Sequence, residues 1–280
     1  MVPGSGYAFV RQRVWFERWI TEGYSIRQLA QQSGHSGKKL RRVIHYWLAH
    51  PPREQDDLTD FRHLVIDGSY IQGRHLAVVA IADPTRNRLV VGWYGVKEGG
   101  EDMHERCRQL AVQGLSPRSV TIDGLPQVYT IATTVWPQVQ VQRCLVHVQR
   151  QGLSWCRRNP RRPDAQHLRA LFVGLSRITT VEHRDQFLQA WQTWEARYGL
   201  AIARQKEHGW VFSDLKRARS MLAKALPYLF VYLDQPQVPS STNWLESYFS
   251  RLKARYRQHR GLSPEHRQNY FTWYFHLCKK

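Results

Sequence analysis

The sequence has few cysteines, few acidic residues and no long apolar run. Its four cysteines form no Cys-x-x-Cys pair, which argues against a disulfide framework and favours a reducing compartment: Cys107, Cys144, Cys156 and Cys278. No stretch of about 18 consecutive apolar residues occurs, and no hydrophobic block follows a basic N-terminus. A membrane-spanning helix and a secretory signal are therefore not predicted, and we expect a cytoplasmic location.

Positive charge is what the sequence has in excess. Lysine and arginine total 41 against 22 aspartate and glutamate, giving a net charge of +19 and an isoelectric point of about 10.2. This excess favours a polyanionic partner, because each neutralised phosphate releases counterions. Charge alone does not separate nucleic acid from an anionic membrane, but the lack of apolar runs makes a membrane the weaker choice. With 42% hydrophobic residues, the 280-residue chain can bury a substantial core.

Residues 1–50 carry the pattern of a helix-turn-helix. Four early apolar residues have the spacing of one helix face: Val14, Trp15, Trp19 and Ile20. Ser25 can then cap a short helix that Gly34 ends, and Ser36 can open the next helix. This second helix is rich in cations: Lys38, Lys39, Arg41 and Arg42. The pattern is typical of a DNA-binding helix-turn-helix, and the alternative is a small helical subdomain with a solvated basic face.

After a polar, proline-containing linker at 51–60, the segment 61–147 has the pattern of an α/β core. Three strand-like runs separated by short turn-rich connections predict an antiparallel meander: 63–70, 75–83 and 88–96. A helix-period segment ending at Gly114 follows, and strands at 119–126 and 137–144 then flank a short helical stretch. Three strands, helix, strand, helix, strand is the order of the ribonuclease H-like fold, a mixed sheet with helices on both faces.

Beyond residue 147 the strand signal fades. Three segments have apolar residues at helical spacing: 165–178, 181–199 and 214–233. We therefore predict an all-helical insertion at 148–240 and return of the chain to the core at 241–280, where the C-terminal helices belong.

Two aspartates stand in equivalent places within the predicted core. Asp67 ends one apolar strand and Asp123 ends another, and each is followed by glycine. For one isolated aspartate we would favour a turn residue that accepts backbone hydrogen bonds. Two such residues on adjacent strands repel each other, and carboxylates brought together in this way are what a hard divalent cation needs.

A third acid begins the helix predicted near the C-terminus. Its apolar stripe would pack on the sheet: Leu245, Tyr248, Phe249, Leu252 and Tyr256. Along one border of that stripe lie Asn243, Glu246, Lys253 and Arg257. Asn243 and Glu246 resemble an N-cap and a capping box, which would explain the acid without any chemistry. Capping leaves the two cations on the same border unexplained, and it leaves the two aspartates without a third ligand.

Five ordered motifs give the sequence a family resemblance: VIDG, TIDG, QRCLVH, VPSSTNWLES and HRGLS. Together they resemble the DDE transposases of bacterial insertion sequences, in the group related to Mutator-like transposases. The resemblance extends over about residues 60–275. A Cys-x-x-Cys zinc ribbon, often found before the helix-turn-helix of close relatives, does not occur in this sequence, so a variant without that module is expected.

The resemblance implies roles for the acids. Asp67, Asp123 and Glu246 would form the catalytic, metal-binding triad and hold two Mg²⁺ ions about 3.5–4 Å apart, with Mn²⁺ able to substitute. Lys253 would bind a phosphate near the element end, and Arg257 is a second candidate for that task. Cys144 and His147 have metal-ligand spacing, but two ligands do not complete a zinc site. We expect Cys144 to be buried and His147 to contact the acids or DNA, and we expect both, together with Asn243, to be accessory residues near the active site.

The predicted protein is therefore a transposase that binds terminal inverted repeats and performs metal-dependent DNA cleavage and strand transfer. Its partners would be the element ends and target DNA, its location the bacterial cytoplasm and nucleoid, and its active form a dimer or higher assembly on DNA. Two alternatives stay open. One is a non-catalytic remnant that binds DNA, and the other is a ribonuclease H-like nuclease or resolvase that joins no strands.

Overall fold

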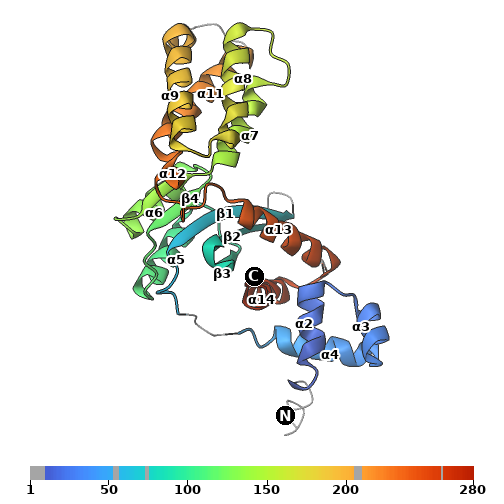
Figure 1. The fold of residues 1–280 in the computed structure, drawn as a ribbon. Coiled ribbons are helices and arrows are strands. Elements are labelled where there is room, and N and C mark those ends of the chain that lie inside the picture. Colours follow the sequence, from blue (N-terminus) through green and yellow to red (C-terminus); the bar gives the residue numbers. More distant parts are fainter. Residues whose placement is uncertain (1–9, 53–56, 73–75, 205–209, 260) are drawn as a thin grey trace. The chain divides into compact units, whose positions relative to one another are not determined.

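The computed structural model describes residues 10–52, 57–72, 76–204, 210–259 and 261–280 (Figure 1). Its chain packs into two compact units. The first comprises residues 1–61, 67–115 and 244–280, and the second comprises residues 62–66 and 116–243.

A mixed sheet of five strands runs through the described residues in the order β3-β2-β1-β4-β5. Its strands are β1 (His63–Gln72), β2 (Leu76–Asp83), β3 (Arg88–Tyr94), β4 (Ser119–Ile122) and β5 (Gln140–Arg143). Strands β2 and β3 are antiparallel, whereas β4 is parallel to both β1 and β5. All four residues of β4 are buried, as expected for a parallel strand covered on both faces. The predicted order of strands and helices through this region is confirmed.

Helices α2 (Arg13–Glu22), α3 (Ile26–Ser33) and α4 (Gly37–Leu48) pack on one another in the first unit (Figure 1). The expected caps are present. The Ser25 hydroxyl accepts from the Gln28 amide and the Gln28 side chain accepts from the Ser25 amide, a complete capping box. Gly34 ends α3 at φ +68°, and Ser36 caps α4. The apolar face of α4 is buried, and its four cations are exposed: Lys38, Lys39, Arg41 and Arg42.

One helix face of the N-terminal region differs from the expectation. In α2 the buried residues are Phe16, Trp19 and Ile20, while Val14 is 50% exposed. The helix itself carries apolar residues on more than one face, so their spacing alone does not determine which face packs against the core.

The first unit also holds α5 (Glu101–Val112), α13 (Asn243–Tyr256) and α14 (Pro264–Leu277). The five apolar residues predicted as the stripe of α13 are all buried. Helix α14 packs on β3 and on α2 and α4. The contact with β3 needs glycine at position 92, because a Cβ there would overlap the Phe275 ring. The ring centroids of Trp273 and Phe16 lie 5.1 Å apart in an edge-to-face arrangement. This aromatic packing joins α14 to α2.

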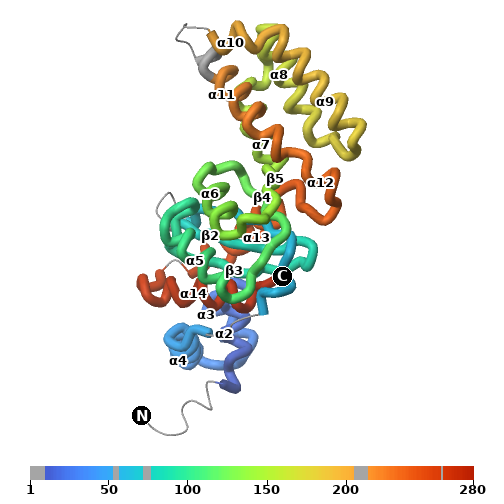
Figure 2. Tube along the Cα trace, turned by 90° about the vertical axis from the view of Figure 1, so that its left-hand side faces the viewer, coloured from blue at the N-terminus to red at the C-terminus, as the bar shows by residue number. Residues whose placement is uncertain are grey.

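After β5, the described elements of the second unit are all helical, as predicted for the insertion at 148–240. The helices of this unit are α6 (Pro126–Val135), α7 (Leu145–Cys156), α8 (Pro163–Gly174), α9 (Val181–Trp194), α10 (Leu200–Arg204), α11 (Trp210–Ala225) and α12 (Val231–Asp234). Helix α7 packs against α8 and α11, and α8 against α9 (Figure 2). A π-helix at Glu195–Gly199 joins α9 to α10. Trp191 and Trp194 are buried and stacked in this core, and the side chain of Trp210 lies outside the described residues.

No helix in the described part of the chain is both long enough and apolar enough to cross a membrane.

Candidate active site

Asp67 lies in β1, in the first unit, and its side chain is buried with 6% of its surface exposed. Its Oδ1 accepts a hydrogen bond of 2.8 Å from the amide of Gly68. A Cβ on Gly68 would overlap the carboxylate of Glu98, so glycine is what allows this approach. Glu98 follows β3, and its carboxylate lies against Gly68, the residue after Asp67. Glu98 could not be predicted as part of the site from the sequence, because its neighbour Gly68 is 30 residues earlier and no spacing rule connects them.

Asp123 follows β4 in the second unit and is half-buried. Its Oδ1 accepts from the Leu125 amide at 2.9 Å, the turn interaction expected of an aspartate at a strand end. Arg143 closes over the turn, donating from Nη2 to the Asp123 carbonyl oxygen at 3.1 Å. Gly124 has φ +111°, and a Cβ there would overlap that guanidinium. Burial lowers the pKa of Arg143, and the nearby Asp123 charge opposes this shift.

Cys144, His147 and Thr242 form a polar cluster in the second unit. His147 Nδ1 lies 3.1 Å from Cys144 Sγ and 3.3 Å from the Thr242 hydroxyl. The Thr242 amide donates to the same sulfur at 3.4 Å. Burial by itself would raise the pKa of Cys144, but its hydrogen bond and charge interaction with His147, together with the Thr242 amide, lower the pKa below its ordinary value. Cys144 is buried, as predicted, and Thr242, which is also buried, was not predicted as a member of this cluster.

Two further hydrogen bonds tie the segment that precedes α13 to the ends of β4 and β5. The Leu145 amide donates to the Ser240 carbonyl at 2.9 Å, and the Thr121 hydroxyl donates to the Pro239 carbonyl at 2.6 Å. Helix α13 starts at Asn243, so the residue before the helix is Thr242 and not Asn243 as the capping-box interpretation required. The Thr242 hydroxyl contacts Cys144 and His147.

Glu246 lies in the first turn of α13 and is half-buried, in the first unit. Lys253 is on the same helix and is also half-buried. Arg257 is exposed and belongs to the short 3-10 turn after α13, so its place is less fixed by the helix than that of Lys253.

Within the part of the chain that the structure describes, no group of three or more His, Cys, Asp or Glu side chains forms a cluster suited to a metal ion. Asp67 and Glu246 belong to the first unit and Asp123 to the second. The three-acid site therefore stays a prediction.

The family model described as "Transposase, Mutator family" matches residues 59–269. The chain belongs to this family. The match contains all three predicted acids, the Cys144–His147–Thr242 cluster and α13, whereas helices α2 to α4 precede it. A comparison with curated proteins gives no match. The family resemblance inferred from the five motifs is confirmed.

Proposed function

We propose that this Mutator-family transposase cuts DNA at element ends and joins the ends to target DNA, using Asp67, Asp123 and Glu246 as its metal-binding acids. One observation carries the proposal most. Strands β1 and β4 are parallel neighbours with Val65 paired to Thr121, and each aspartate follows its paired residue by two positions. Two acids at equivalent positions of adjacent parallel strands suit a shared cation.

The donor set fits a hard divalent cation such as Mg²⁺, because all three predicted ligands are carboxylates. The surroundings of Asp67 support this fit. Asp67 is nearly fully buried, and the Glu98 carboxylate lies against the next residue, Gly68, so a fourth carboxylate is close to the predicted ligand Asp67. When bound, Mg²⁺ would supply Lewis-acid stabilisation for phosphoryl transfer.

The residues around the acids would position DNA. Lys253 lies seven residues after Glu246 on α13 and would bind a backbone phosphate, and Arg257 would do so beyond the helix end. The contacts of Cys144, His147 and Thr242 would hold the segment that leads to Glu246. We propose that α3 and α4 form a helix-turn-helix in which the exposed cations of α4 face the DNA. The catalytic core would be ribonuclease H-like. Two element ends must meet during transposition, so we expect a dimer or larger assembly on DNA in the nucleoid.

The decisive experiment measures strand cleavage and joining. Purified protein would be given labelled duplexes carrying the ends of the element that encodes it, with Mg²⁺ or with EDTA. We expect metal-dependent nicks that leave a 3′-hydroxyl, followed by joining of that end to target DNA. Asp67→Asn and Glu246→Gln keep the side-chain shape and should abolish both products, because each removes a charge that the metal needs. Glu265→Gln, at an exposed position of α14, is the matched control and should react like the wild type.

Other outcomes would favour the alternatives. Salt-sensitive binding with no metal-dependent product would identify a DNA-binding remnant. Cleavage without joining would identify a nuclease or resolvase. Full activity of Asp67→Asn would contradict the proposed triad.

A further inference from the structure

An arginine-rich connection between α7 and α8 borders a cavity of about 390 Å³ in the second unit. The connection reads RRNPRR over residues 157–162, and Arg157, Arg161 and Arg162 line the cavity. Trp155, which is half-buried, supplies apolar surface on the same lining, and the buried Leu215 lies beneath it. The cavity is of the size that holds a small ligand or one unit of a polymer.

The cavity has an excess of positive charge. Arg162 is paired with Asp164 through two hydrogen bonds of 3.1 and 2.6 Å. The guanidinium groups of Arg157 and Arg161 are exposed and make no ion pair with any described residue. Burial raises the pKa of the Cys156 thiol to about 12, so this lining residue contributes no negative charge at neutral pH. The lining therefore offers two unpaired cations and no free acid.

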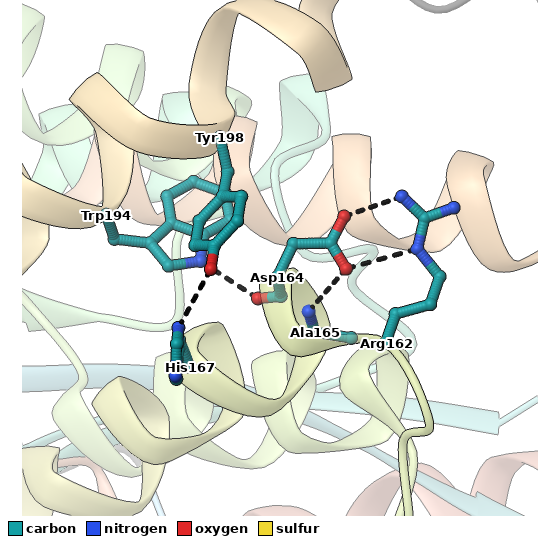
Figure 3. A network of polar contacts seen from close by, with 6 residues as sticks. All are labelled: Arg162, Asp164, Ala165, His167, Trp194 and Tyr198. Carbon is teal, nitrogen blue, oxygen red and sulfur yellow. Dashed lines mark hydrogen bonds and ion pairs between the residues drawn. The ribbon is translucent and has the colours of Figure 1, made fainter.

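The connection is held by hydrogen bonds from α8 and α9. Arg169 Nε donates to the Arg157 carbonyl at 2.9 Å, and Gln166 donates to the Pro160 carbonyl at 3.0 Å. At the other end, Trp194 Nε1 donates to the Asp164 carbonyl at 2.9 Å, while the Asp164 carboxylate engages Arg162 and the Ala165 amide (Figure 3). The arginines are thus presented by a fixed backbone, which lowers the entropy lost when they bind a ligand.

Arg157 occupies a backbone conformation that normally belongs to glycine. Its φ is 61° and its ψ is 170°. Among the described residues other than glycine, Arg157 and Asn87 have positive φ, and an asparagine tolerates this far better than an arginine. Strained residues of this kind persist where the surrounding structure holds them, and they cluster at active sites and ligand clamps. The strained backbone of Arg157 places its guanidinium at the cavity.

We propose that this arginine pocket binds a phosphodiester group of the duplex DNA backbone, as a DNA contact additional to those of α4 and α13. The proposal rests on the proposed function, because it supposes that DNA is the substrate. The guanidinium groups of Arg157 and Arg161 match phosphate oxygens in charge and geometry. The adjoining sugar would pack on the half-buried ring of Trp155. The contact carries no base-specific group, so it fixes the position of the DNA and does not select its sequence.

The test compares the double variant Arg157→Gln, Arg161→Gln with the double variant Arg177→Gln, Arg197→Gln. The second pair removes the same charge from exposed arginines of the same unit that do not line the cavity. Fluorescence anisotropy with a labelled duplex of mixed sequence, over a series of salt concentrations, gives the affinity and its salt dependence. Circular dichroism melting checks that each variant is folded.

We expect the pocket variant to bind DNA about tenfold more weakly at low salt, with a slope of log affinity against log salt smaller by about 0.9 for each lost phosphate contact. The control pair should change the slope little. Equal effects in both pairs would overturn the proposal and leave only the general attraction of a basic protein for DNA. If the wild type binds no duplex at all, the proposed function fails together with the pocket.

A free nucleotide offers the same phosphate chemistry, so a second arm uses ATP at constant ionic strength. We expect ATP to shift the melting temperature of the wild type and of the pocket variant equally. A shift in the wild type that the pocket variant loses would make the cavity a nucleotide site and overturn the assignment to DNA.

Discussion

The hydroxyl of Thr121 on β4 donates a 2.6 Å hydrogen bond to the carbonyl oxygen of Pro239, 118 residues further along the chain. Thr121 is completely buried. The bond therefore holds a strand of the predicted catalytic core to the segment that leads into α13. The helical segment that separates Asp123 from Glu246, two of the predicted catalytic acids, must return at a defined point, and this is one of the bonds that fix the return.

Replacing Thr121 by valine should destabilise the protein by about 1–3 kcal/mol, because the Pro239 carbonyl loses its donor. Urea unfolding at neutral pH would measure the change. Thr121→Ser keeps the hydroxyl and should restore most of the loss. Thr134→Val, at an exposed position of α6, is the control and should stay within about 0.5 kcal/mol of the wild type. Equal stability of Thr121→Val and the control would show that the bond contributes nothing.

His259 predicts how stability depends on pH. Its ring is 6% exposed, lies against Trp19 and is 3.0 Å from the Trp19 carbonyl through Nε2. Burial lowers the pKa of His259 to about 4, against the opposing effect of that hydrogen bond. The unfolded chain therefore takes up a proton on this histidine near pH 6.5, while the folded chain does so only near pH 4.

The contribution of His259 to stability should accordingly be complete above about pH 6.5, fall as the pH drops toward 4, and level off below that, for a loss of up to about 3 kcal/mol. The free energy of unfolding at several pH values would measure this. His259→Gln keeps a donor for Trp19 but cannot titrate, so its difference from the wild type should change over this pH range. A parallel pair of profiles for wild type and His259→Gln would contradict the prediction.

The basic face of α4 gives a prediction for DNA affinity. Arg41 and Arg42 are exposed while the opposite face of the helix is buried, so their replacement by glutamine should leave the melting temperature unchanged. If α4 faces DNA, the double variant should bind a duplex more weakly, with a salt slope smaller by about 0.9 per lost phosphate contact. Arg106→Gln with Arg108→Gln removes two exposed arginines from α5 and serves as the control. An identical loss in both pairs would mean that α4 is an ordinary solvated face.

The parts of the structure that the sequence predicted well depend on local rules. Ser25 and Ser36 cap their helices because a hydroxyl can reach an amide three residues on, and the spacing of the α13 stripe follows from the helical period. The parts that it missed depend on approaches between distant segments. Glu98 meets Gly68 and Thr242 meets Cys144 because the fold brings them together, and no local pattern records such a meeting. The arginine run at 157–162 was visible, but the cavity beside it needed the packing of α7, α8 and α11.

Because Arg157 has a strained backbone and lines the cavity, replacing it by glycine should change stability and DNA binding in opposite directions. Arg157→Gly should relieve about 1–3 kcal/mol of strain while increasing the entropy of the unfolded chain by about 0.5–1 kcal/mol, for a net gain of about 1 kcal/mol. Urea unfolding would measure this gain. Arg158→Gly is the matched control, because Arg158 is exposed like its neighbour but has no positive φ, so it should be destabilised.

The same Arg157→Gly variant should bind duplex DNA more weakly than the wild type, since the guanidinium is gone although the fold is more stable. A more stable protein that binds less well is what a residue kept for its ligand produces. Lower stability together with unchanged DNA affinity would show that Arg157 has a structural role. The two measurements therefore decide whether the strained backbone serves the pocket or the packing of the α7–α8 connection.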